Sequence, residues 1–386
     1  MILIKNVDVY NPEKKGKKDI FIAGNKIVDI KDNINLDFKN LKKIEGSNLI
    51  ATPGLIDSHV HILGGGGEGG FHKRTPDIKL STIIKAGVTT LVGCLGTDGI
   101  ARSMESLVAK AKSLKHYGLS VFLYSGSYQL PPTTLTDNIM KDIMFIDEII
   151  GAGEIAISDH RSSQPSFNEL KKFISNVRRA GILSNKCGII NFHLGDSKKG
   201  LEPIMNIVKE TEIPITQFYP THINRNPKLF KEGIEFAKKG GFIDFTTSTT
   251  KKFLELGEVE APLAIKKSLN AGVGIEQLTM TSDGQGSLPD FDKNGNLVGL
   301  SIGTSISLLN SVIKAINKYD ISIENAFKTV TLNPAKILKL NNKGEIKINK
   351  DADIVLFNKD FTIKYVISNG SLMIGNSKLL KKGIFE

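Results

Sequence analysis

Apolar runs that end in polar residues alternate, along the middle of the chain, with segments of helical periodicity. Apolar positions recur every three or four residues in 103–116, 168–179 and 227–239, which predicts helices there. Counting from residue 54, the apolar runs predict strands at 54–62, 89–95, 119–125, 154–158, 188–193, 214–219, 242–246 and 276–282. Strands that alternate with helices are typical of a parallel sheet, and eight such units predict an α/β fold, a closed (β/α)8 TIM barrel.

The two ends of the chain have a different pattern. Short strand-like runs flank Gly24-Asn25 near one end and Asn369-Gly370 near the other. Both dipeptides are typical of the turn of a β-hairpin. We therefore expect residues 1–50 and 341–386 to share one small β-domain, and residues 51–340 to form the barrel.

Length and cysteine content are consistent with this division. The chain has 386 residues, and barrels of this type take about 250. No run approaches about 18 apolar residues, and the first residues lack the pattern of a signal peptide. Cys94 and Cys187 are too few for a disulfide framework, and we interpret both as buried small apolar residues. A soluble cytoplasmic protein is expected.

The net charge of +11 favours nucleic-acid binding less than it first suggests. Dispersed lysines supply nearly all of the positive charge, there is no tryptophan, and no basic stripe is interleaved with aromatic residues. A solvated lysine surface is the better interpretation. We expect neither nucleic acid nor a membrane as a partner. Arginine is scarce, and Arg161 and Arg225 lie close in sequence to candidate metal or catalytic positions.

The segment Asp57-Ser58-His59-Val60-His61 ends the first predicted barrel strand. Side chains two residues apart on a strand point the same way, so His59 and His61 can hold one cation between them. Imidazole is a common ligand of zinc and similar ions, and a pair leaves positions open for water and substrate. The alternative is two histidines stacked on one face of an ordinary strand.

Other chemically competent residues fall at or near the ends of later strands, where a barrel places its chemistry. They are Glu154 in the fourth strand, His193 after the fifth, His222 after the sixth and Asp283 after the eighth. Four of the seven histidines therefore share one rim. Each alone could be structural, but their joint placement predicts a metal site. We interpret His72, His116 and His160, which lack this placement, as structural.

Several longer motifs carry a resemblance to a known family. They are Gly64-Gly65-Gly66-Gly67-Glu68, Leu95-Gly96-Thr97-Asp98, Ser158-Asp159-His160-Arg161-Ser162, His193-Leu194-Gly195-Asp196-Ser197-Lys198-Lys199, Pro220-Thr221-His222-Ile223-Asn224-Arg225-Asn226 and Ser282-Asp283-Gly284-Gln285-Gly286-Ser287. With the histidine pattern, they resemble the amidohydrolase superfamily and, within it, the isoaspartyl (β-aspartyl) dipeptidases. The resemblance covers almost the whole chain and implies a small β-sandwich domain built from both termini.

The resemblance implies a metal-dependent dipeptidase that hydrolyses the β-aspartyl bond of isoaspartyl dipeptides through a metal-bridging hydroxide. It implies two divalent metal ions per subunit, with zinc preferred. His59 and His61 with Asp283 would hold one ion, and His193 with His222 the other. Two cations roughly 3.5 to 4 Å apart can activate a bridging water and polarise the scissile carbonyl. Asp283 would also carry the proton to the leaving amine, the alternative being a role as ligand alone.

The chain departs from the family at the bridging ligand. Most members carry a lysine converted to a carbamate, whereas this chain has Glu154 and no lysine between Lys141 and Lys171. A glutamate offers the same charge and two oxygens, so Glu154 can bridge two cations. Its shorter stem requires a closer backbone, which the small residues Gly151, Ala152 and Gly153 would permit. The alternative is a surface carboxylate beside a single metal.

The remaining site residues follow from the charges of the substrate and the resemblance. Glu68 would pair with the substrate ammonium, with Gly66 and Thr97 nearby. Substrate carboxylates would bind to Arg161, Arg225 and Ser287. Tyr128 would donate a hydrogen bond to the developing oxyanion. The alternatives are a solvated loop acid for Glu68, an ordinary aromatic for Tyr128 and surface ion pairs for the arginines. The glycine run is interpreted as a mobile loop.

Two other classes of function stay open. One is another amidohydrolase, of the dihydroorotase, hydantoinase or deacetylase type, which would lack Glu68 as an ammonium receptor. The other is a non-catalytic scaffold, although each ligand position holds a competent residue. The resemblance also implies a homo-oligomer, with an octamer as one form.

Overall fold

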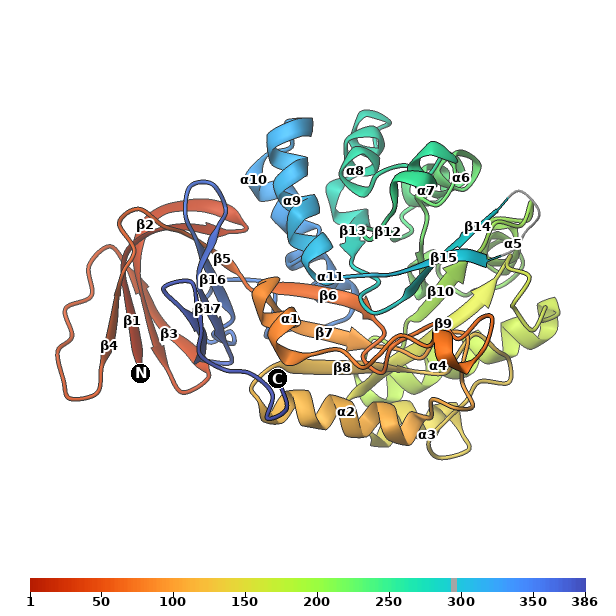
Figure 1. Ribbon diagram of the computed structural model, residues 1–386, viewed down its shortest axis with the longest axis horizontal. Coiled ribbons are helices and arrows are strands. Elements are labelled where there is room, and N and C mark those ends of the chain that lie inside the picture. The colour runs from red at the N-terminus through yellow and green to blue at the C-terminus, as the bar shows by residue number, and fades with distance from the viewer. Residues whose placement is uncertain (293–296) are drawn as a thin grey trace.

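Eight parallel strands follow one another around a barrel in the structure, a computed structural model that describes residues 1–292 and 297–386 (Figure 1). They are β6 (Leu55–Val60), β7 (Val88–Gly93), β8 (Ser120–Ser125), β9 (Ile149–Ile157), β10 (Ile190–Leu194), β11 (Phe218–Thr221), β12 (Ile243–Thr246) and β13 (Leu278–Thr281). Strands β6 to β11 form one sheet, and β12 pairs with β13. The Ile223 N–H donates to Asp244 O, and the His61 N–H donates to Gly284 O, which closes the barrel between these sheets. The predicted barrel is confirmed.

Helices and short turns of 3-10 helix connect the barrel strands. They are η1 (Phe71–Lys73), α1 (Leu80–Lys85), α2 (Met104–His116), α3 (Ile139–Phe145), α4 (Phe167–Ser184), α5 (Glu202–Glu210), η2 (Ile215–Gln217), α6 (Pro227–Lys238), α7 (Lys251–Glu255), α8 (Ala261–Asn270), η3 (Ile275–Gln277), α9 (Ile306–Tyr319), α10 (Ile323–Lys328) and α11 (Leu332–Ile337). A capping box of Ser166 and Glu169 fixes the start of α4. The apolar faces of the helices and strands share one large core.

Most predicted barrel elements lie within a few residues of the observed ones, with two differences. The fourth strand begins at Ile149, five residues before the predicted start at 154. The prediction missed its first half because Gly151, Ala152 and Gly153 interrupt the apolar pattern there. The segments predicted as strands at 214–219 and 276–282 begin as η2 and η3, and β11 and β13 start only at Phe218 and Leu278. Both differences concern where a strand begins, whereas the chemistry lies where strands end.

The two termini form a second sheet beside the barrel, with red and blue strands side by side in Figure 1. Its strands are β1 (Ile2–Asn11), β2 (Glu13–Ala23), β3 (Lys26–Lys31), β4 (Lys42–Glu45), β5 (Ile50–Pro53), β16 (Ile354–Phe357), β17 (Ile363–Ser368), β18 (Ser371–Gly375) and β19 (Lys378–Leu379). Asn369 and Gly370 have φ of 46° and 71°, as a hairpin turn of type I′ requires. The sheet encloses its own core, which joins Ile20 and Ile27 to Ile354 and Ile367.

One antiparallel strand pair beside the barrel lies outside the predicted pattern. Strands β14 (Ser287–Phe291) and β15 (Leu297–Ile302) pair in antiparallel fashion just after β13. Ser287, the first residue of β14, therefore follows the last barrel strand closely. In the described part of the chain, no helix has the length and apolar composition that a membrane span needs.

Candidate active site

The barrel brings the six predicted metal-ligating residues together inside its carboxyl-terminal rim. His59 lies on β6 and His61 follows it; Glu154 lies on β9; His193 lies on β10; His222 and Asp283 follow β11 and β13. All six residues are buried, and none is more than 8% exposed as a whole residue. His222 and Asp283 have φ of 62° and 51°, conformations that cost free energy and concentrate at functional sites.

Glu154 lies at the centre of this group and contacts both sets of histidines. Its Oε1 is 2.6 Å from His193 Nδ1, 3.2 Å from His222 Nε2 and 3.6 Å from His59 Nε2. Its Oε2 is 3.6 Å from His61 Nε2. The side chain is fully buried, so Glu154 is not a surface carboxylate. One carboxylate therefore lies within reach of four imidazoles from three strands.

The backbone of β9 reaches this position through Gly153. Its φ is 153°, and a Cβ at this residue would lie 2.9 Å from Cβ and O of Asn191 on the neighbouring strand β10. A side chain would push the two strands apart, so only glycine permits this approach. The same Asn191 uses Oδ1, 2.9 Å from His59 Nδ1, to fix the His59 ring with Nε2 facing the cluster.

Two buried oxygens in the cluster accept no hydrogen bond from any residue that the structure describes. They are Glu154 Oε2 and Asp283 Oδ1, although Asp283 Oδ1 lies 3.1 Å from His61 Nε2. A buried carboxylate oxygen without a donor is costly unless a cation or water binds it. Two groups of donors lie close enough to share a cation: His59, His61, Cys94 and Glu154, and Glu154, His193 and His222. The residues present thus fit bound metal, with Glu154 common to both groups.

The electrostatics of the cluster favour positive charge between these residues. Burial opposes ionisation of Glu154, but His59 and His193 hold its pKa well below the usual range. Burial alone would lower the pKa of His59, but the neighbouring Cys94 and Glu154 raise it well above its ordinary value. Burial and Arg225 lower the pKa of His222 to about 3, so this ring is neutral. Cations that displace the histidine protons would meet an anionic carboxylate and neutral imidazoles, the forms that bind metal.

A cavity of about 1210 Å³ opens beside the cluster. Every predicted site residue except His59 lines it, and these are His61, Gly66, Glu68, Thr97, Tyr128, Glu154, Arg161, His193, His222, Arg225, Asp283 and Ser287. Acidic, basic and hydroxyl side chains all line this one cavity. It is large enough for a small charged molecule to lie against the histidines.

Glu68 and Arg161 meet across this cavity wall. Arg161 Nη1 donates to Glu68 Oε1 at 2.9 Å, and Thr97 Oγ1 donates to the same oxygen at 2.8 Å. Arg161 also binds Asp159 with Nε and Nη2. Glu68 and Arg161 are thus paired with each other in the cavity wall, and their side chains are half-buried, with exposed fractions of 29% and 24%.

Tyr128 and Arg225 converge on His193. The Tyr128 hydroxyl is 2.7 Å from His193 Nδ1, and burial raises the pKa of this phenol well above its usual value. Arg225 Nη1 lies 3.0 Å from His193 Nε2 and donates to the carbonyl of Leu194. Tyr128 stays protonated, so its hydroxyl can donate a hydrogen bond into the cavity.

The sequence did not indicate three residues that the structure places here. Cys94 is buried as expected, but its Sγ lies beside the histidine rings of His59 and His61, so its interpretation as a purely apolar residue is wrong. Cys187, which was also expected to be buried, is half-buried. Asp159 lies in the motif at 158–162, and its carboxylate accepts hydrogen bonds from Arg161. Arg102 is buried and donates to the carbonyls of the glycine-rich loop at Leu63, Gly65 and Gly66. This loop is therefore held at several carbonyls.

Comparison with known proteins agrees with the architecture. Residues 254–373 match the model of the Amidohydrolase family. An adenine deaminase of Clostridium perfringens is 25% identical over 401 residues; the match covers all of this chain, which spans only 61% of the deaminase. A dihydroorotase of Clostridium acetobutylicum is 23% identical, with 94% of this chain and 92% of that protein covered. The fold and site thus define a barrel enzyme of the amidohydrolase class.

Solved structures of a beta-aspartyl dipeptidase are much more similar, with sequence identities of 45% and 43%. One of them is the crystal structure of beta-aspartyl dipeptidase from Fervidobacterium islandicum AW-1 in complex with beta-Asp-Leu dipeptide, with 45% sequence identity and a TM-score of 0.93. The match covers 99% of this chain and 98% of that one. The chain therefore belongs to the beta-aspartyl dipeptidases of the amidohydrolase superfamily, and the resemblance found in its motifs is confirmed.

Proposed function

We propose that this protein hydrolyses the β-aspartyl bond of isoaspartyl dipeptides in a metal-dependent reaction. The observation that carries the proposal is the joint placement, in one cavity, of the buried histidine–carboxylate cluster and the Glu68–Arg161 pair. The 45% identity to a beta-aspartyl dipeptidase over nearly the whole chain supports it. The cluster accounts for hydrolysis, and the charged pair accounts for a substrate with charges of both signs.

The cluster is proposed to hold two divalent ions, with zinc preferred. His59 and His61 with Asp283 would hold one, His193 with His222 the other, and Glu154 would bind both. The two oxygens without hydrogen bonds, on Glu154 and Asp283, support this division. When bound, such a pair of ions lowers the pKa of a water and polarises the scissile carbonyl.

Asp283 is proposed to move the proton between the attacking water and the leaving amine. Asp283 lines the cavity, and its buried Oδ1 accepts no hydrogen bond from the described residues. Burial disfavours the charged form, but the neighbouring His61 lowers the pKa of Asp283 to about 2. The carboxylate is therefore ionised at neutral pH and able to take a proton.

Tyr128 and the charged groups of the cavity are proposed to position the dipeptide. The protonated Tyr128 hydroxyl would donate to the carbonyl oxygen as negative charge develops on it. Glu68, with Thr97 and Gly66 beside it, would bind the free ammonium. Arg161, Arg225 and Ser287 would bind the carboxylates, since guanidinium groups bind them with two parallel hydrogen bonds. On substrate binding, the Glu68–Arg161 pair would exchange its partners for those of the dipeptide.

A comparison of substrates tests the proposal. Purified protein reconstituted with zinc is assayed with isoaspartyl-leucine, α-linked aspartyl-leucine, dihydroorotate, a hydantoin and an N-acetyl sugar. We expect hydrolysis of isoaspartyl-leucine, with the others slower by orders of magnitude. Faster turnover of dihydroorotate, the hydantoin or the N-acetyl sugar would assign the site to another amidohydrolase reaction.

The organisation of the molecule adds three further proposals. First, we infer that residues 1–50 and 341–386 form one folding unit and residues 51–340 the other. Second, we infer that copies of the chain assemble into a homo-oligomer such as an octamer. Third, we infer that the protein acts in the cytoplasm. The continuous terminal sheet supports the first, with its strand β5 running to Pro53, three residues beyond the boundary. Light scattering on the purified full chain measures the assembly, and a monomer would contradict the second.

A further inference from the structure

Cys94 lies beside the metal-site histidines and has no part in the reaction proposed above. It follows β7 directly, and β7 pairs in parallel with β6, which carries His59. The Cys94 N–H donates to Val60 O at 3.0 Å, so the register of these strands fixes the thiol between the two histidines. The side chain is fully buried.

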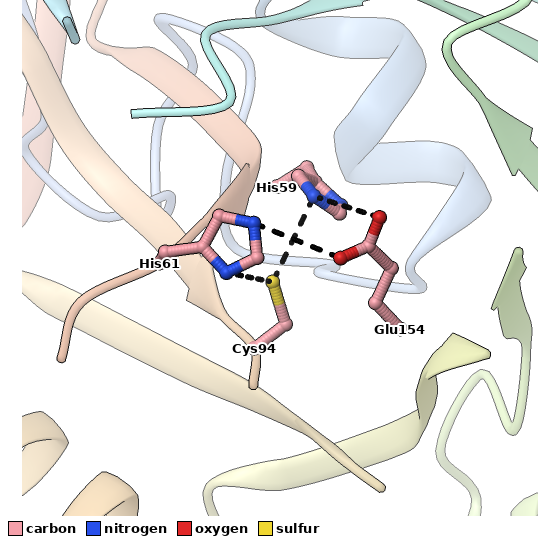
Figure 2. A group of neighbouring side chains, drawn as sticks. All are labelled: His59, His61, Cys94 and Glu154. Atoms are coloured by element: carbon pink, nitrogen blue, oxygen red, sulfur yellow. Dashed lines mark hydrogen bonds and ion pairs between the residues drawn. The ribbon is translucent and has the colours of Figure 1, made fainter. Parts of the chain in front are cut away.

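The thiol sulfur points at both imidazoles (Figure 2). Cys94 Sγ is 3.8 Å from His59 Nε2 and 3.8 Å from His61 Nδ1. The donor atoms of His59, His61, Cys94 and Glu154 all lie within 4.8 Å of one another. In a tetrahedral zinc site with bonds of about 2.0 to 2.3 Å, neighbouring ligand atoms are roughly 3.5 Å apart. With one donor atom taken from each residue, small side-chain shifts would bring the four to the spacing of one coordination shell.

A second observation points to a ligand at the same place. Glu154 is fully buried, its Oε2 accepts no hydrogen bond, and this oxygen lies 3.6 Å from His61 Nε2. The contacts of the thiol itself are all long: Sγ is 3.7 Å from Val60 O and 3.8 Å from each imidazole. The Glu154 carboxylate and the Cys94 sulfur therefore flank the same two imidazoles, with Glu154 Oε1 3.6 Å from His59 Nε2 and Oε2 3.6 Å from His61 Nε2.

We propose that the Cys94 sulfur is a ligand of the ion held by His59 and His61, together with Glu154. The inference rests on the proposed metal centre and extends it. Coordination replaces the S–H proton, which passes to solvent, so the sulfur binds as a thiolate. A thiolate favours zinc, cobalt and cadmium over magnesium, calcium and manganese. Cys94 would therefore make this position selective for zinc-like ions.

The absorption spectrum of the cobalt-loaded protein tests this contact directly. Metal-free full-length protein is titrated with Co²⁺, and the near-ultraviolet region is followed for sulfur-to-cobalt charge transfer. We expect this band in the wild type and its loss in Cys94→Ser. Cys187→Ser is the matched control, because the other cysteine donates its S–H to Ile150 O and contacts none of the metal-site residues among the contacts described.

Metal preference provides a second readout that does not depend on activity. Loss of a partner that only orients a metal ligand typically lowers metal affinity by about 10- to 100-fold. Loss of a ligand should cost at least as much, so Cys94→Ser should lower Zn²⁺ affinity by about 10-fold or more but leave Mn²⁺ affinity nearly unchanged, because oxygen ligands suit manganese. Equal losses for both ions, or none for zinc, would contradict the inference. Thermal unfolding of the metal-free variants establishes that they fold, and Cys94→Ala serves if the serine variant does not.

The outcomes separate this inference from the proposed function. A cobalt spectrum without sulfur charge transfer, with isoaspartyl-leucine still hydrolysed, would overturn the proposal that Cys94 binds the ion. The proposed dipeptidase activity would stand, and Cys94 would then only orient the His61 ring. A charge-transfer band that disappears in Cys94→Ser, without hydrolysis of isoaspartyl-leucine, would establish the ligand and contradict the substrate.

Discussion

Glu68 and Arg161 form an ion pair in the wall of the cavity, with 2.9 Å between Glu68 Oε1 and Arg161 Nη1. They come from loops after different barrel strands, β6 and β9, and Thr97 supports the pair from a third. Arg161 is held on its other side by Asp159. The free protein thus keeps the two proposed receptors for the substrate's charges against each other, so binding exchanges one set of ion pairs for another.

Glu68→Gln should weaken binding of dipeptides with a free amino group. A hydrogen bond to a charged group is worth about 1.5 to 3 kcal/mol, so KM should rise by about 10- to 150-fold. Metal content should not change, because Glu68 contacts none of the histidines among the contacts described. The check is kcat/KM for isoaspartyl-leucine and its N-acetyl form. If the wild type cleaved both equally well, Glu68 would not be the ammonium receptor.

Asp283→Asn should remove most of the activity while leaving much of the metal. An amide is a weak ligand but cannot accept a proton, and general acid–base groups contribute about 10²- to 10⁴-fold. Single-turnover rates and metal analysis of the same preparation separate the two effects. Activity close to that of the wild type, with full metal content, would leave Asp283 as a ligand alone.

Gly153→Ala should disturb the cluster through the backbone. The new Cβ would lie 2.9 Å from Cβ and O of Asn191, which orients His59. Gly240→Ala is the matched control: Gly240 also has a positive φ, of 92°, but a Cβ there has nothing within 4 Å. Both variants carry backbone strain, and only Gly153→Ala should also lose metal affinity. Equal metal affinity in the two would show that β9 and β10 can separate without cost.

Lys343 should stabilise the terminal sheet. It is buried, with Nζ 2.8 Å from Asp351 and 2.6 Å from Asp353. Removing one partner of a buried pair costs about 3 to 5 kcal/mol, so Lys343→Met should lower the free energy of unfolding by about that amount. Urea unfolding at neutral pH measures it. Lys347→Met, at an exposed position of the same segment, should change it by at most about 0.5 kcal/mol.

The pH dependence of this pair has a defined sign. Burial works against both charges, but Asp353 and Asp351 raise the pKa of Lys343, and Lys343 and Lys26 lower that of Asp351. A raised lysine pKa stabilises below the unfolded value of about 10.4, and a lowered aspartate pKa stabilises above about 3.9. The difference between wild type and Lys343→Met should therefore be largest between these limits and shrink in acid. A difference that grew in acid would contradict the pairing.

The sequence predicted the barrel and the placement of the ligands because strand ends are marked by the change from apolar to polar residues. His59, His193 and Asp283 could be found in this way. Contacts between loops could not, since nothing in the motifs shows that Arg161 turns toward Glu68 and Asp159 rather than solvent. Cys94 was missed for a related reason: its neighbours are on the adjacent strand, and only the register of β6 against β7 brings them together.

Metal content and activity after reconstitution without bicarbonate provide the most direct test of the central claim, that Glu154 binds both ions. Wild type, Glu154→Gln and Glu154→Ala are stripped of metal, reloaded with zinc in buffer free of carbon dioxide, and analysed for zinc per subunit and isoaspartyl-leucine hydrolysis. We predict two zinc ions and full activity in the wild type, and joint loss of both in the variants, because the cations lose the anion that offsets their repulsion. Two zinc ions and normal turnover in Glu154→Ala, or a requirement for bicarbonate in the wild type, would contradict the claim.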